Sequence, residues 1–196
     1  MRRTITGLAL VALLAGCATR DASPPASTGV PPASPTTTTS ILPPSPPGGG
    51  LALDESLLAI LPADVDGVAP EGAPEAFEEA RGDPGLAGNV EAIVFFAVPG
   101  PEDLVAGSVS RLRPGVWGDA FWRDWRDTFD EGACAQAGGV TGRAEADIGG
   151  RLVSITSCAG GLRAYHAFVA ERGLIVSLFS LGDGRWGQRI MESLRP

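Results

Sequence analysis

The residue types that carry most enzyme chemistry are scarce in this 196-residue chain. All 15 basic residues are arginine, and His166 is the only histidine. These counts exclude a lysine nucleophile and any metal site built on several histidines. No serine has the flanking glycines of a nucleophile elbow. We therefore expect no catalytic residue, no metal and no cofactor.

His166 lies in an alternating segment that is typical of a β-strand. With a period of two residues, its side chain shares a face with Ala164 and Phe168, and Tyr165 points to the other face. We expect a half-buried, hydrogen-bonded histidine. The alternative is a catalytic base, which would need a nucleophile and an orienting acid. His166 is thus a candidate contact for a ligand or partner.

The four tryptophans all fall in the C-terminal half of the chain. Trp122 and Trp125 have the spacing of a helix that packs on a core, although the same residues could line an apolar ligand cavity. Trp117 differs because it follows a Pro-Gly turn in a predicted loop. Exposed tryptophans are common hot spots of binding, so Trp117 is the second candidate contact residue.

The N-terminus has the organisation of an export signal. Arg2 and Arg3 precede the apolar residues 5–14, a stretch too short for a bilayer core, which needs roughly 20 residues. The stretch ends in Leu14-Ala15-Gly16-Cys17, which resembles the lipobox of bacterial lipoproteins at every position. The resemblance implies cleavage before Cys17 and acylation of that cysteine, including palmitate. The acyl chains would anchor the protein to the outer face of the cell membrane.

Two cysteines remain, Cys134 and Cys158. An even number of cysteines in an exported chain predicts a disulfide between them. The alternative is a redox or metal site that combines this pair with His166. Their separation of 24 residues fits neither a Cys-x-x-Cys motif nor a zinc ribbon.

Charge is unevenly distributed in the chain, whose net charge is −8. Acidic residues dominate residues 54–103, which we interpret as a solvated surface because the Asp64-Val65-Asp66 segment lacks the spacing of a calcium loop. The arginines form no basic block. This excludes a nucleic acid as a partner.

Three regions follow one another along the chain. Residues 1–16 are predicted to be a lipoprotein signal peptide, and residues 17–50 the lipidated cysteine and a disordered linker. The linker, with nine prolines and eleven serines or threonines between residues 18 and 50, has too little apolar surface to fold. Residues 51–196 are long enough for a single globular domain.

Periodicity and turn signals predict an α+β fold for that domain, with the order α-α-β-β-α-β-β-β-β-α. An antiparallel sheet is expected to consist of a two-strand hairpin and a four-strand meander, with helices packed on it. The predicted helices are 54–61, 74–81, 119–131 and 184–194. The predicted strands are 91–98, 104–112, 141–148, 151–158, 162–171 and 174–181.

The helix over 119–131 has the clearest amphipathic pattern. Phe121, Trp122, Trp125 and Phe129 form an apolar stripe, and the charged residues fall opposite. We therefore expect Asp130 to face solvent, paired with the arginine four residues earlier.

The element order over residues 91–196 looks like that of the LpqN-type lipoproteins of actinobacteria, which share a Mog1/PsbP-like sandwich. This resemblance carries no site residue. Together with the lipobox, the long linker and the missing catalytic pattern, it favours a non-catalytic module that binds an envelope protein or a small lipid ligand. The alternative is an envelope hydrolase or redox enzyme that uses His166 or the Cys134/Cys158 pair.

Overall fold

The computed structural model describes residues 50–195 of the chain. The predicted signal peptide over 1–16, the lipidation site at Cys17 and the linker up to residue 49 lie outside the described residues. Within the described part, no helix is long and apolar enough to cross a membrane.

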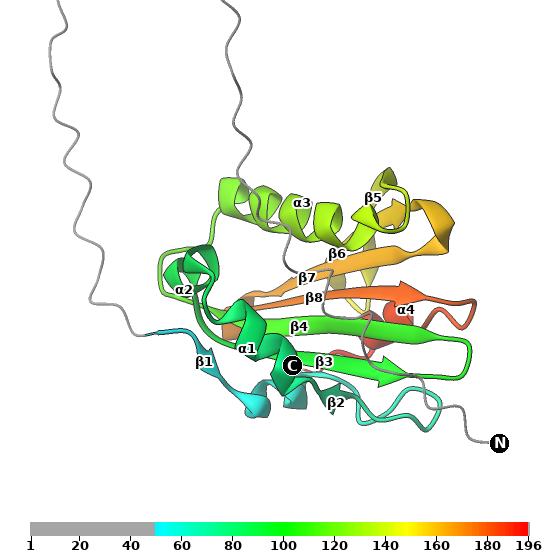
Figure 1. The fold of residues 1–196 in the computed structure, drawn as a ribbon, viewed down its shortest axis with the longest axis horizontal. Helices are drawn as coiled ribbons and strands as arrows, with labels where there is room; N and C mark the ends of the chain where they lie inside the picture. The colour runs from blue at the N-terminus through cyan, green and yellow to red at the C-terminus, as the bar shows by residue number, and fades with distance from the viewer. Residues whose placement is uncertain (1–49, 196) are drawn as a thin grey trace, which may run out of the picture.

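One open, mostly antiparallel sheet organises the domain (Figure 1). Its strand order is β1-β3-β4-β8-β7-β6-β5, and the short β2 also pairs with β3. β1 runs parallel to β3, and the other pairs are antiparallel. The strands are β1 (Ala52–Leu53), β2 (Glu71–Gly72), β3 (Val90–Pro99), β4 (Leu104–Leu112), β5 (Val140–Ile148), β6 (Arg151–Cys158), β7 (Arg163–Val169) and β8 (Leu174–Leu181).

The helices are short, apart from α3. The α-helices are α1 (Pro74–Ala80), α2 (Pro84–Asn89), α3 (Asp119–Ala135) and α4 (Trp186–Glu192). The 3₁₀ segments are η2 (Glu55–Ile60), η3 (Ala159–Gly161) and η4 (Ala170–Arg172).

The α+β class is as predicted, but the detailed order differs in several places. The first predicted helix is the 3₁₀ turn η2, and α2, β1 and β2 are additional elements. The expected hairpin and meander form one sheet because β8 returns to lie beside β4, with Ser177 opposite Ser108. This pairing crosses about 70 residues of sequence, and no local pattern encodes it.

One face of the sheet carries the main apolar core. Side chains of β3, β4, β7 and β8 pack there against η2 and α4, through Leu57, Ile60, Ile190 and Met191. The Trp186 indole N–H donates to the Asp66 carboxylate at 3.0 Å, which joins α4 to the loop after η2. This face is closed by apolar contacts.

The opposite face is covered by α1 and α3 (Figure 1). α1 covers β3 with the apolar side chain of Phe77. α3 lies over the other half of the sheet, and the sulfur atoms of Cys134 and Cys158 are 1.98 Å apart, the distance of a disulfide bond. The C-terminal end of α3 is thereby fixed to β6.

Candidate functional site

A row of polar side chains crosses the sheet beneath α3. The strand register places these residues directly opposite one another on successive strands, from β4 to β5. Because directly opposed residues in a sheet share a face, all of them point toward α3. We call this set the polar row: Ser108, Ser177, His166, Ser154 and Glu145.

His166 is the centre of the polar row and is completely buried. Its Nδ1 lies 3.0 Å from the Ser177 hydroxyl, and its Nε2 lies 2.9 Å from a carboxylate oxygen of Asp130 on α3. The second Asp130 oxygen accepts a hydrogen bond from the Thr156 hydroxyl at 2.5 Å. One helix and three strands, α3, β6, β7 and β8, thus meet in one hydrogen-bonded cluster.

The donors in this cluster fit one consistent arrangement. The Trp125 indole N–H donates to the Ser177 oxygen at 3.0 Å. The Ser177 hydroxyl proton then donates to Nδ1 of His166, and the Nε2 proton donates to Asp130. Every polar group of His166 and Ser177 is satisfied, as burial requires.

The surroundings of Asp130 hold its carboxyl group in the ionised form. Burial by itself would raise the pKa of Asp130, but the hydrogen bond from His166 and the electrostatic interaction with its ring lower it. The Thr156 hydroxyl and the Arg143 guanidinium, whose Nε lies 3.6 Å away, also lower it. The net result is a pKa below the ordinary value of an aspartate.

A second polar contact ties α3 to the outer strands. The Arg126 guanidinium donates to the Ser154 hydroxyl at 2.8 Å and pairs with Glu145 at 3.2 Å. It also lies 5.4 Å from the centre of the Trp122 ring. Polar contacts therefore anchor the underside of α3 in addition to the apolar contacts of Phe121, Trp122 and Trp125.

The Asp130–His166–Ser177 chain has the residue types of a hydrolytic triad but not its setting. Ser177 is fully buried, and β8 pairs with β4 on one side and β7 on the other. Its backbone N–H groups are used in the sheet and leave no oxyanion site. As it stands, this cluster orients and stabilises α3.

An open hollow of about 460 Å³ adjoins the N-terminal end of α3. Trp117 stacks on Phe168, with ring centres 3.4 Å apart and planes 7° apart, and Trp122 lies at 5.3 Å from Trp117. Trp117 is 42% exposed and Leu152 is 63% exposed. We call this set the aromatic hollow: Trp117, Trp122, Leu152 and Phe168, with Arg151 and Glu171 at its rim.

The two candidate contact residues from the sequence lie in different environments. Trp117 is at the surface of the aromatic hollow, whereas His166 is buried beneath α3. Trp122 lies between them, at 6.3 Å from the His166 ring in an edge-on geometry. His166 therefore supports the wall of the hollow and offers no atom to a ligand.

The prediction that Asp130 faces solvent is wrong. Asp130 is 1% exposed and lies on the sheet side of α3, and Arg126 pairs with Glu145 and not with Asp130. One feature of the sequence indicates that Asp130 is buried. A disulfide at Cys134 puts that residue on the sheet side, and Asp130, one turn earlier, shares its face. Ser177 and Thr156, the other partners of the cluster, had no comparable signal.

Within residues 50–195, no group of three or more histidine, cysteine or acidic side chains could hold a metal ion.

No protein-family model matches this chain, and the comparisons with curated proteins and with solved structures found no match.

Proposed function

We propose that this protein is a lipid-anchored lipoprotein of the bacterial cell envelope whose domain is a non-catalytic, protein-binding module. The lipobox ending at Cys17 and the proline-rich linker support the location, as does the element order that resembles LpqN-type lipoproteins. The observation that carries the binding role is the aromatic hollow, with Trp117 and Leu152 exposed.

The form of the aromatic hollow favours a protein partner over a lipid held in a cavity. The main core is filled by packed side chains, and the hollow is open at the surface. An apolar centre with Arg151 and Glu171 at the rim is the usual anatomy of a protein interface. The space suits one or two apolar side chains of a partner.

Site-specific photo-crosslinking in living cells tests this function. A crosslinking phenylalanine analogue would replace Leu152 in the full-length chain, and the same analogue in place of Glu79, exposed on α1, serves as the control. We expect one discrete protein adduct at position 152 and none at 79. Adding Trp117→Ala should lower the affinity for the partner by roughly 30-fold and so reduce the yield of the adduct, because truncating a hot-spot tryptophan costs about 2 kcal/mol or more of binding free energy.

Two outcomes would contradict the protein-binding role. One is the absence of any adduct at position 152, and the other is an adduct that Trp117→Ala leaves unchanged. Native mass spectrometry of the purified chain adds a further test. A lipid-sized mass that leaves on denaturation would indicate a ligand carrier.

A hydrolase is the second candidate function, favoured only by the distances within the Asp130–His166–Ser177 chain. It requires α3 to move, because Trp125 and the sheet bury the serine hydroxyl. A fluorophosphonate probe tests it directly. Labelling that disappears with Ser177→Ala would support an enzyme, and we expect no labelling.

A further inference from the structure

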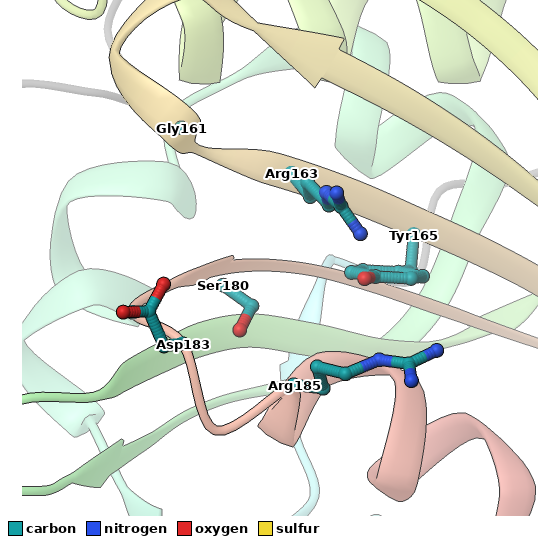
Figure 2. Close-up of a pocket in the computed structure, with 7 residues that line it drawn as sticks. Gly161, Arg163, Tyr165, Ser180, Asp183 and Arg185 are labelled. Carbon is teal, nitrogen blue, oxygen red and sulfur yellow. The ribbon is translucent and has the colours of Figure 1, made fainter.

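A second hollow, of about 530 Å³, lies on the α4 side of the sheet (Figure 2). It is bordered by the start of β7, the end of β8 and the loop that leads to α4. We call it the arginine pocket and define it by Arg163, Tyr165, Ser180, Asp183 and Arg185. It shares no residue with the aromatic hollow.

The two arginines of this pocket are not neutralised by carboxylates. Among residues 50–195, neither Arg163 nor Arg185 forms an ion pair, and Arg185 donates only to the neutral Gln188 amide oxygen. Asp183 also borders the pocket, but its carboxylate points away from both guanidinium groups in Figure 2. The lining thus carries two arginines and one carboxylate, and the Asp103 carboxylate lies against the same loop, where it accepts the Gly184 N–H at 2.8 Å.

Two hydroxyl groups complete the lining. Tyr165 is 3% exposed, and its ring lies between the two arginine side chains in Figure 2. Ser180 is 6% exposed, and its oxygen accepts the Gly187 N–H at 3.2 Å, which leaves its proton to donate. Ser180 and Arg163 are direct register partners, so the sheet fixes their spacing.

The loop holds Arg185 in a costly backbone conformation. Its φ is +55°, and Asp66 is the only other non-glycine residue with a positive φ in the described region. A left-handed conformation of a residue other than glycine costs about 1 kcal/mol or more, and such strain is concentrated at functional sites. The strained residue is thus Arg185 itself, which lines the pocket.

We infer that the arginine pocket binds a phosphate group, either free or on a lipid headgroup. Guanidinium groups match phosphate oxygens with paired N–H donors. The donors here come from two strands and a loop, β7, β8 and the loop before α4. The remaining volume accommodates the group that carries the phosphate.

The test uses the full exported chain with Cys17→Ser, which removes the predicted lipidation. Calorimetric titration with inorganic phosphate at constant ionic strength measures free-anion binding. Cosedimentation with phosphatidylglycerol vesicles, compared with phosphatidylcholine vesicles, measures headgroup binding. The double variant Arg163→Gln/Arg185→Gln removes both guanidinium groups. Arg123→Gln is the matched control, because Arg123 is exposed on α3 and forms no ion pair within residues 50–195.

We expect saturable binding of phosphate, of phosphatidylglycerol vesicles or of both, and at least a tenfold loss in the double variant. The affinity of Arg123→Gln should stay within twofold of that of the parent chain. Tyr165→Phe, which keeps the packed ring, should bind a few-fold more weakly. If the double variant loses binding in the vesicle assay alone, the ligand is a lipid headgroup. If it loses binding in the phosphate assay alone, the ligand is the free anion. The inference is overturned if neither probe binds, or if the double variant binds as the parent does.

Discussion

Replacement of Asp130 tests the argument that a polar cluster holds α3 on the sheet. The carboxylate is buried and accepts hydrogen bonds from His166 and Thr156. A hydrogen bond to a charged group contributes about 1.5–3 kcal/mol, and the Asp130 carboxylate accepts two of them. We therefore expect Asp130→Ala to lower the free energy of unfolding by about 3–5 kcal/mol at pH 7.

Asp130→Asn separates the charge from the hydrogen bonds. The amide oxygen still accepts from His166, so the expected loss is smaller, about 1–3 kcal/mol. The pKa of Asp130 is lower in the folded chain than in the unfolded chain, so its ionised form stabilises the fold at neutral pH. That contribution is lost as the pH falls below about 4, through the folded-state pKa. The difference between wild type and Asp130→Asn should shrink accordingly.

Urea unfolding followed by tryptophan fluorescence between pH 7 and pH 3 gives these free energies. Asp124→Asn, an exposed carboxylate on the same helix, is the control and should change stability by less than about 0.5 kcal/mol. A loss below about 1 kcal/mol for Asp130→Ala would refute the argument. So would a wild-type to Asp130→Asn difference that does not change with pH.

Three further predictions concern other parts of the chain. Cys134→Ser/Cys158→Ser should lower the free energy of unfolding by about 3 kcal/mol in a urea titration, because the bond closes a loop between residues 24 apart; an unchanged midpoint would contradict this. Gly107→Ala should destabilise the sheet by about 1–3 kcal/mol, since a Cβ there would meet the Ser177 carbonyl oxygen and lie 2.6 Å from the Leu178 Cβ. Gly142→Ala, with open space around it, is its control and should unfold nearly as wild type does. Cys17→Ser should move the protein from the membrane fraction to the soluble fraction on fractionation, and retention in the membrane fraction would count against the lipid anchor.

The sequence alone determined the local features of the domain. Alternation placed His166 on one face with Ala164 and Phe168, and glycine pairs marked turns such as Gly149-Gly150, where φ is positive at both residues. The bounds of β6 and β8 agree with the predicted ranges. These features follow from side-chain periodicity and backbone sterics within a few residues, so a sequence expresses them directly.

Only the tertiary structure decided which of these elements meet. The β7–β8 hairpin pairs Ser177 with His166, and the return of β8 beside β4 places Ser177 next to Ser108, which extends the polar row across the sheet. The rotation of α3 turns Asp130 inward because that row offers partners for a buried charge. An amphipathic pattern predicts that a charged residue faces solvent, because burying a charge without a partner is unfavourable. The partner of Asp130 is His166, which lies 36 residues away in the sequence. The two hollows likewise arise where loops and strands distant in sequence come together, which local periodicity does not encode.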